Sequence, residues 1–295
     1  MNIKTSLAHW FRCGLTLISP KLNTEVIYKT KFHKKLDLEH PVTLNEKILW
    51  LKFNTYWENP LIKQCADKYR VREYIQEKGY SNLLVGLIGA YDNVDDIDWA
   101  SLPPSFALKL NVGCGSNIIV RDKSKLDIEA TKKTLQKWLK PTLWYLGYSE
   151  MQYKGVKPYI IIEEYLGSED GNLPDDYKFY CMNGKSKYVM VCEDRVIGKK
   201  AKYFYFDKGW NMMPYTQDAL DDPERIIPKP DKIDEAFHVA ELLSRDFPFV
   251  RVDLYIVKGK VYFGELTFTP SAGMDNGRLP LTDKLLGDQL ILPKK

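Results

Sequence analysis

The segment that most constrains the fold runs from Phe249 to Pro270 and reads as two strands around a glycine turn. Side chains alternate along both halves, as in a hairpin with one buried face. Asp253 lies in the first predicted strand and Glu265 in the second. A buried carboxylate must be paired, protonated or bound to a metal. These two acids are therefore the first candidate site.

The turn between the two strands decides whether the acids can act together. A two-residue loop at Lys258 and Gly259 would place Asp253 and Glu265 on opposite faces of the ribbon. A three-residue loop with Gly259 in the left-handed conformation would place them on one face. We expect this bulged hairpin, because it pairs hard oxygen ligands suited to Mg²⁺. The alternative is structural: Asp253 pairs with Arg251 or another base, and Glu265 is a solvated edge residue.

Composition narrows the class of protein. A chain of 295 residues, 44% of them hydrophobic and 13% aromatic, can bury a substantial core in one large domain or two modest ones. A net charge of +4 gives no support for nucleic acid as the main partner. The five cysteines form no CxxC pair, which argues against a zinc site and fits a reducing compartment. We therefore expect a cytoplasmic protein.

The N-terminal segment shows no membrane span. Its longest uncharged run, Cys13 to Pro20, is too short to cross a bilayer, and it lacks a cleavage signature. We interpret it as an amphipathic segment that packs on its own domain. Membrane contact is at most peripheral, and in that alternative it involves Trp10, Phe11, Leu15 and Leu17. The basic stretch 29–35 is read as a solvated loop, with anionic lipid or an acidic glycan as alternative partners.

The rest of the chain interleaves helices and strands. Thr43 and Glu46 form a capping box at the start of a helix, and a second helix is expected from Pro60 to Lys78. Asn183-Gly184 predicts a hairpin, and the aromatic stretch 203–210 reads as a loop. This pattern indicates an α+β fold with mainly antiparallel sheets.

Two further stretches can carry nucleotide chemistry. A strand bearing Lys109 runs into Gly113-Cys114-Gly115, which fits neither a Walker A loop nor a dinucleotide fingerprint. Its backbone N–H groups could cradle phosphate, but taken alone the glycines are better explained by an ordinary hairpin turn. The apolar strand that ends in Glu163-Glu164 could border an adenine pocket or be a charged edge strand.

A third motif suggests a different enzyme. Asp96 and Asp98 form a DxD triplet of the kind that metal-dependent glycosyltransferases use to hold a nucleotide sugar. The triplet lies in a predicted turn rather than after a hydrophobic strand. It is kept as an alternative.

Taken in order, these pieces resemble the ATP-grasp family of carboxylate–amine ligases. They are most similar to its TupA-like branch, which is named for teichuronopeptide biosynthesis and occurs with capsule and surface-polysaccharide genes. The resemblance covers most of residues 43–270 and is carried by LNEKILWLK, ADKYRVREYI, FALKLNVGCGSNIIV, EEYL, LPDDYKFYCMNG and DFPFVRVDLYIVKGKVYFGELTFTP.

The resemblance implies an ATP-grasp fold, in which two α+β subdomains with mainly antiparallel sheets clasp ATP. It implies a helix-rich region over 1–100, a small flap subdomain over 101–165 and a large subdomain with the metal site over 166–295. Its implied nucleotide-binding residues are Lys68 and Lys109 at the phosphates, Gly113, Gly115 and Ser116 in the flap, Glu164, Tyr165 and Leu166 at the adenine, and Glu169 or Asp176 near the ribose.

The resemblance also implies the chemistry. Lys178, Arg195 and Arg251 would surround the transferred phosphate and the acyl substrate, while Asp253 and Glu265 would hold Mg²⁺. Two positions depart from the family pattern, because Thr267 replaces an asparagine as third metal ligand and Cys114 occupies the centre of the flap.

The implied activity is ATP-dependent formation of an amide through an acyl phosphate. The substrates would be a uronic acid or other carboxylate of a capsule or surface polysaccharide and an amino acid or amine, with polysaccharide-assembly proteins as possible partners. The alternatives are a metal-dependent glycosyltransferase that uses Asp96 and Asp98, or a non-catalytic scaffold of polysaccharide assembly.

Overall fold

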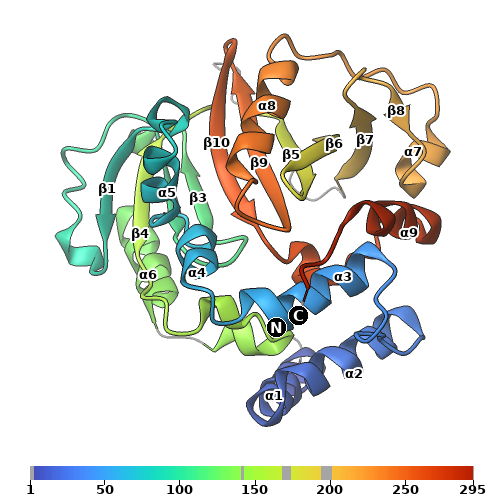
Figure 1. Ribbon diagram of the computed structural model, residues 1–295. Coiled ribbons are helices and arrows are strands. Elements are labelled where there is room, and N and C mark those ends of the chain that lie inside the picture. The colour runs from blue at the N-terminus through green and yellow to red at the C-terminus, as the bar shows by residue number, and fades with distance from the viewer. Residues whose placement is uncertain (1–2, 141–142, 168–173, 194–200, 295) are drawn as a thin grey trace.

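The computed structural model describes residues 3–140, 143–167, 174–193 and 201–294. Within these residues two antiparallel sheets lie side by side, the smaller on the left of Figure 1 and the larger on the right. The smaller sheet has the order β1 (Leu87–Tyr91), β4 (Ile160–Glu164), β2 (Phe106–Leu110), β3 (Asn117–Val120). The larger has the order β10 (Lys260–Thr267), β9 (Phe249–Val257), β5 (Asp176–Met182), β6 (Lys185–Glu193), β7 (Lys202–Asp207), β8 (Met212–Met213).

Helices cover both sheets and extend below them in Figure 1. They are α1 (Ile3–Ile18), α2 (Pro20–Phe32), α3 (Leu44–Leu51), α4 (Pro60–Ala66), α5 (Val71–Glu77), α6 (Ile128–Leu139), α7 (Gln217–Asp221), α8 (Ile233–Leu243) and α9 (Pro280–Gln289). A π-helical turn, η1 (Lys52–Tyr56), continues α3, and short 3₁₀ turns include η5 (Trp144–Tyr148). The predicted α+β fold with mainly antiparallel sheets is confirmed.

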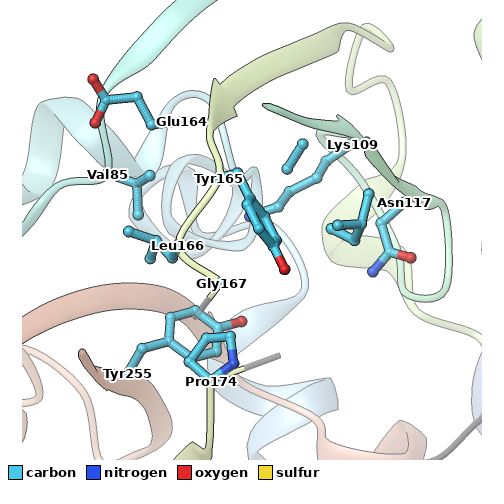
Figure 2. A pocket seen from close by; sticks show the side chains of 11 residues that line it. Val85, Lys109, Asn117, Glu164, Tyr165, Leu166, Gly167, Pro174 and Tyr255 are labelled. Carbon is cyan, nitrogen blue, oxygen red and sulfur yellow. The ribbon is translucent and has the colours of Figure 1, made fainter. Parts of the chain in front are cut away.

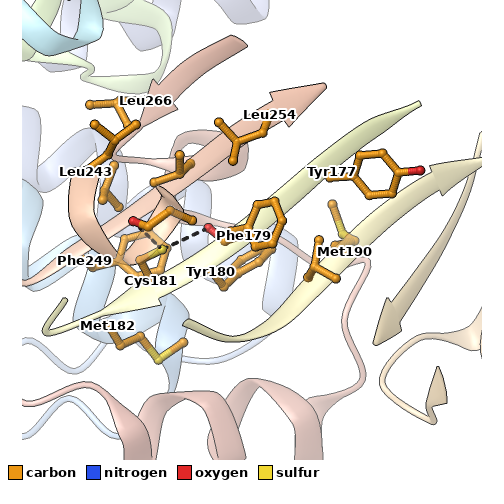
Figure 3. Close-up of a cluster of buried hydrophobic side chains, with 14 of the residues drawn as sticks. Tyr177, Phe179, Tyr180, Cys181, Met182, Met190, Leu243, Phe249, Leu254 and Leu266 are labelled. Carbon is orange, nitrogen blue, oxygen red and sulfur yellow. Dashed lines mark hydrogen bonds between the residues drawn. The ribbon is translucent and has the colours of Figure 1, made fainter. Parts of the chain in front are cut away.

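The core of the larger sheet lies between its strands and α8. In Figure 3 side chains of β5, β6, β9 and β10 converge with Leu243 of α8. Phe179 and Phe237 meet edge to face with ring centroids 4.9 Å apart. Cys181 donates through Sγ to the carbonyls of Phe179 and Ala240. Each large side chain buried here contributes about 1.5–3 kcal/mol, so this core fixes β9 and β10, which carry the acids.

The helix expected from Pro60 to Lys78 is two helices. The predicted helix is wrong over residues 67–70, where the chain leaves α4 before starting α5. The Asp67 carboxylate accepts hydrogen bonds from the backbone N–H groups of Tyr69 (2.8 Å) and Arg70 (3.2 Å), as a capping residue does at the start of a new turn. The break turns Lys68 out of the helical path and toward the junction of the two sheets.

The aromatic stretch 203–210, expected as a loop, contains β7. Val191 of β6 pairs with Phe204, and Phe204, Tyr205 and Phe206 are all buried. The prediction is wrong because the strand is covered on both faces, so its sequence lacks the apolar–polar alternation of a half-buried strand. The Asn183-Gly184 hairpin and the Thr43–Glu46 capping box are confirmed.

The N-terminal segment packs on the domain with only one face. Cys13 and Thr16 are buried against η5, where the Thr16 hydroxyl donates to the Leu146 carbonyl at 2.6 Å. Residues 29–32 belong to α2 rather than to a loop. No helix among the described residues combines the length and apolar character needed to cross a bilayer. The residues named for membrane contact are mostly exposed: Trp10, Phe11 and Leu17, with Leu15 half-buried.

Candidate active site

The turn between β9 and β10 is a two-residue loop. Val257 pairs with Lys260, and both loop residues, Lys258 and Gly259, have positive φ of 50° and 71°. Two consecutive residues in this region define the tight hairpin turn that matches the twist of its strands. The expectation of a three-residue loop is therefore wrong.

Asp253 and Glu265 nevertheless lie directly opposite each other. The reason is a bulge in β10 at Gly264, which is the extra residue between Phe263 and Glu265 in the register. A Cβ added at Gly264 would lie 2.9 Å from the backbone oxygen of Asp253, so only glycine fits without displacement. The prediction that both acids share one face is confirmed, but the bulge and not the turn produces it.

Cations surround this acid pair. Asp253 accepts two hydrogen bonds from Arg251, each at 2.7 Å, and one from Lys178 Nζ at 2.6 Å. Arg251 Nη2 also lies 3.5 Å from Glu265 Oε1 and donates to the Thr267 hydroxyl at 3.2 Å. Arg251 thus does pair with Asp253, as the structural alternative stated. Glu265, in contrast, is part of the same charged group rather than a solvated edge residue.

Glu265 is held in its charged form. Burial alone would raise the pKa of this carboxyl, but Lys68, Arg251 and Lys178 outweigh burial and bring the pKa down to about 2. The Thr267 hydroxyl, 3.2 Å from Glu265 Oε1, acts in the same direction. Glu265 is therefore an anion at neutral pH and a ligand of the kind that a divalent cation needs.

Lys68 connects the glycine loop with the acid pair. Its Nζ donates to the carbonyl of Gly113 and lies 3.7 Å from Glu265 Oε2. Gly113 and Gly115 both have positive φ, 74° and 77°, and the Ser116 carbonyl accepts from Leu110 N–H where β2 ends. The predicted flap residues thus lie at the junction of the two sheets, next to a carboxylate of the larger one.

Two residues that the sequence analysis missed anchor this loop. The fully buried Asn111 donates to Asp67 Oδ2 at 2.8 Å and accepts from Tyr159 N–H at 2.8 Å. Asp67 in turn starts the turn that carries Lys68. The sequence held one signal for this anchor, an asparagine between an apolar strand and a glycine loop. A side-chain amide buried at such a position must be hydrogen-bonded, which points to a structural partner.

Lys109 is paired within the smaller sheet. Its Nζ lies 2.7 Å from Glu163 Oε2, and Arg72 holds the other oxygen of Glu163 at 3.2 Å. Lys109 and Glu163 are diagonal cross-strand neighbours of β2 and β4, since Glu163 pairs with Ala107, two residues before Lys109. Glu163 rather than Glu164 therefore faces the predicted phosphate-binding lysine.

A cavity opens between the two sheets beside this lysine (Figure 2). Strand β4 ends at Glu164, so the backbone of Tyr165 and Leu166 lies outside the sheet ladder. Figure 2 shows the Tyr165 ring pointing into the space between Lys109 and Tyr255, while the Glu164 carboxylate points away from it. The walls come from both sheets and from the segment that joins them: Val85, Ala107, Lys109, Asn117, Ile119, Glu164, Tyr165, Leu166, Gly167, Pro174 and Tyr255.

A second cavity of about 260 Å³ has Lys178 and Arg251 in its wall. Its floor holds the buried Arg278, which is fixed by Asp275 at 2.8 Å and Asp283 at 2.9 Å. The remaining walls are mainly aromatic and polar: Tyr180, Met190, Tyr203, Tyr205, Thr216, Ser271, Asn276 and Gly277. The sequence analysis did not identify this cavity.

The other predicted residues divide into three groups. Asp176 is buried and accepts from Lys178, on the side of the acid pair. Glu169 and Arg195 lie outside the described residues. Asp96 and Asp98 are exposed, and Asp98 accepts from the N–H groups of Ala100 (3.1 Å) and Ser101 (3.3 Å), as a turn-capping residue does.

The donor set at the acid pair suits Mg²⁺. Asp253 and Glu265 offer carboxylate oxygens on one face, and Thr267 offers a hydroxyl beside them. No group of three or more acidic, histidine or cysteine ligands occurs among the described residues. Mg²⁺ is commonly held by one or two carboxylates together with substrate phosphates and water, so two carboxylates suffice when a nucleotide is bound.

Two antiparallel sheets flank a cavity, and Lys68 joins the glycine loop of the smaller sheet to the acid pair of the larger one. This arrangement is that of the ATP-grasp class of fold. The chain belongs to the TupA-like ATP-grasp family, whose model matches residues 46–291. The resemblance found in the sequence is therefore confirmed.

Solved structures that are similar to this chain include two ligases. D-alanine–D-alanine ligase from Bacillus anthracis complexed with ATP has 15% identity and a TM-score of 0.47, covering 77% of this chain and 65% of that one. Phosphoribosylamine–glycine ligase from Thermotoga maritima has 13% identity and a TM-score of 0.38, covering 72% and 50%. This chain thus spans less than two thirds of the length of either. A search of curated proteins finds no significant match.

Proposed function

We propose that this protein is an ATP-dependent carboxylate–amine ligase that forms an amide and releases ADP and phosphate. The observation that carries the proposal is the meeting of Lys68, the glycine loop and Glu265 at the junction of the two sheets, where Lys68 Nζ contacts Gly113 and lies 3.7 Å from Glu265. A polyphosphate needs this combination of cation, backbone N–H groups and metal-binding acid.

ATP would occupy the cavity between the sheets. The adenine would lie against Leu166 and the backbone of Tyr165, since apolar side chains line that part of the cavity. The phosphates would extend toward Lys109, Lys68 and the N–H groups of the flap at Gly113, Gly115 and Ser116. Glu164 and either Glu169 or Asp176 remain our candidates for the rim of the adenine and for the ribose.

Asp253 and Glu265 would hold Mg²⁺, with Thr267 as a third donor. When bound, the ion neutralises charge on the β- and γ-phosphates of ATP. Lys178 and Arg251 already lie at Asp253, and we assign them, with Arg195, to the charge that develops on the transferring phosphoryl group and the acyl substrate.

The reaction proceeds in two transfers. A carboxylate oxygen of the first substrate attacks the γ-phosphorus of ATP, the bond to the β-phosphate oxygen breaks, and ADP leaves. The amine of the second substrate then attacks the carbonyl carbon of the acyl phosphate, and inorganic phosphate leaves with the C–O bond electrons while the nitrogen loses a proton. Phosphorylation is needed because a carboxylate itself is a poor acylating agent.

The cavity lined by Lys178 and Arg251 is our candidate site for the acyl substrate. Three tyrosines and the polar side chains of Thr216 and Asn276 line it, and such walls suit a sugar ring with its hydroxyl groups. We therefore propose a uronic acid of a capsule or other surface polysaccharide as the carboxylate and an amino acid as the amine. Polysaccharide-assembly proteins would be partners, and the site of action would be the cytoplasm.

The test is release of ADP from ATP and Mg²⁺ in the presence of paired uronic acids and amino acids, with mass spectrometry of the amide product. We expect ADP release that requires both substrates and falls about 10²–10³-fold in Glu265→Gln, because one pre-set charge contact of the transition state is lost. Asp96→Asn is the matched control and should retain activity.

Two results would overturn the proposal. Hydrolysis or transfer from a UDP-sugar that is lost in Asp96→Asn but kept in Glu265→Gln would identify a glycosyltransferase. Absence of both ATP binding and ADP release with every pair of carboxylate and amine would identify a scaffold. A separate test of the substrate compares the surface polysaccharide of cells with and without the protein. We expect an amide-linked substituent to be missing in the cells that lack it.

A further inference from the structure

Helix α1 presents one buried and one exposed face. The buried face carries Cys13 and Thr16, and Asn23 of α2 completes its contacts by donating to Thr16 Oγ1 at 2.8 Å. The opposite face is apolar at helical spacing and is between 63% and 78% exposed: Leu7, Trp10, Phe11, Leu17 and Ile18. We call these five residues the α1 face. An amphipathic helix normally turns such a face toward an apolar phase.

Exposed apolar side chains also occur on the neighbours of α1. Leu22 and Val26 of α2 are 41% and 39% exposed. Tyr148 of η5 and Leu143 are also exposed, and the Tyr148 hydroxyl accepts from Arg12 Nη1 at 3.3 Å. Figure 1 shows α1 and α2 at the lower edge of the molecule, away from the larger sheet. Seven exposed apolar side chains thus lie on the two consecutive helices α1 and α2, rather than occurring singly over the surface.

Positive charge is concentrated in the same segment. Residues 1–35 contain seven lysines and arginines and one glutamate, a net charge of +6, whereas the whole chain carries +4. The other residues together therefore carry −2. Arg12, Lys21 and Lys29 lie on α1 and α2 themselves. A basic and apolar helix pair on a slightly acidic body is suited to an anionic apolar surface.

We propose that α1 and α2 dock the protein on a bilayer that contains anionic lipid. The α1 face would enter the boundary between headgroups and acyl chains, with Trp10 at headgroup depth, and the lysines and arginines would contact the lipid phosphates. Apolar side chains and positive charge act together here, and neither suffices for stable anchoring alone. The inference goes beyond the proposed ligase activity and does not depend on it.

The test is flotation of the full chain with vesicles of phosphatidylcholine alone or mixed in equal parts with phosphatidylglycerol. We expect binding to the anionic vesicles only, weakened by added salt. The double variant Trp10→Glu/Phe11→Glu should bind roughly tenfold more weakly or worse, because it removes two large apolar side chains from the interface. The matched control is Ile226→Glu/Leu281→Glu, at positions that are 87% and 69% exposed on other surfaces, and it should bind like the original chain.

Each other outcome overturns the proposal. If both double variants bind vesicles equally well, or if the original chain does not bind, the α1 face is not a membrane contact. A self-associated protein that ignores vesicles and becomes monomeric in Trp10→Glu/Phe11→Glu would assign the face to a second copy of the chain. Binding to a soluble acidic glycan but not to vesicles would show that the lysines and arginines of α1 and α2 bind a glycan rather than lipid. An unchanged thermal transition shows that the variants fold.

Discussion

Asp253 can serve either a structural ion pair or a metal, and its neighbours explain why sequence alone does not choose. Arg251 is two residues away on the same strand face, and Glu265 is opposite on the next strand. Both Arg251 and Glu265 can therefore approach the Asp253 carboxylate. In the structure Arg251 donates to Asp253 and also contacts Glu265. The cation and the two acids therefore form one group, and the pairing does not exclude a metal when nucleotide is bound.

The Arg251–Asp253 pair should be important for stability. Arg251→Met leaves the buried Asp253 carboxylate with Lys178 as its hydrogen-bonded cation and two other acids nearby, and we expect the free energy of unfolding to fall by about 3–5 kcal/mol. Combined with Asp253→Asn, the same change should cost much less, because no buried charge is then left uncompensated. Urea denaturation of the single and double variants measures both effects. Equal losses in the two would show that the pair is not coupled.

Glu265 should make stability depend on pH in the acid range. Its pKa is about 2 in the folded protein and about 4.3 in an unfolded chain, so its stabilising contribution is complete above the higher value and lost as pH falls toward the lower. The stability difference between the original protein and Glu265→Gln should therefore stay constant from neutral pH to about 5 and shrink below about 4.3. Urea midpoints across this range test it, with exposed Glu224→Gln as the control for one lost charge. A difference that does not change below pH 4 would contradict the charge arrangement.

At the scale of elements, the β9–β10 hairpin shows what the sequence could and could not predict. The strands were predictable from alternation, and the two acids stood out by their apolar setting, but their shared face was expected from a three-residue turn that the structure does not have. The actual cause of the shared face was not predictable, because Gly264 looks like any strand glycine until the backbone of Asp253 is seen to pass 2.9 Å from where its Cβ would be. The turn was misassigned because Lys258 adopts a positive φ that glycine or asparagine usually supplies.

Substitution of Gly264 should therefore disturb the site more than substitution in the turn. Gly264→Ala forces the Asp253 backbone to shift, and we expect a loss of about 1–3 kcal/mol in stability together with weaker binding of ATP and Mg²⁺. Gly259→Asn is the control, since nothing lies within 4 Å of its Cβ position and asparagine tolerates a positive φ. Thermal unfolding with and without the nucleotide reports both quantities. Equal effects of the two variants would show that the bulge does not set the register.

Long-range contacts account for the remaining errors at this scale. The break between α4 and α5 depends on Asp67, which binds Asn111 of the glycine loop, 44 residues away. The periodicity of apolar residues along one helix carries no information about such a distant partner. Strand β7 was missed for a related reason, since its two faces are covered by residues outside the strand, with Trp210 stacked on Phe206 and Tyr215 against Tyr205.

At the scale of the whole molecule, the order of short motifs was more informative than any single motif. Lys68, the segment from Lys109 to the glycine loop, and the acid pair are far apart in sequence, and the fold brings them to one junction between two sheets. Composition and periodicity alone would have given only an α+β class. The division into 1–100, 101–165 and 166–295 stays a prediction, and β1 at Leu87–Tyr91 pairs with β4 in the smaller sheet.

The central claim is that an adenine nucleotide binds between the two sheets with its metal on Asp253 and Glu265. The most direct measurement is calorimetric titration of the protein with ATP, with and without Mg²⁺, compared with Glu265→Gln and the surface control Asp96→Asn. We predict that Mg²⁺ tightens ATP binding in the original protein and in Asp96→Asn, and that this gain is lost in Glu265→Gln while metal-free binding persists. Mg²⁺-dependent binding of equal strength in all three proteins, or no ATP binding at all, would contradict the account.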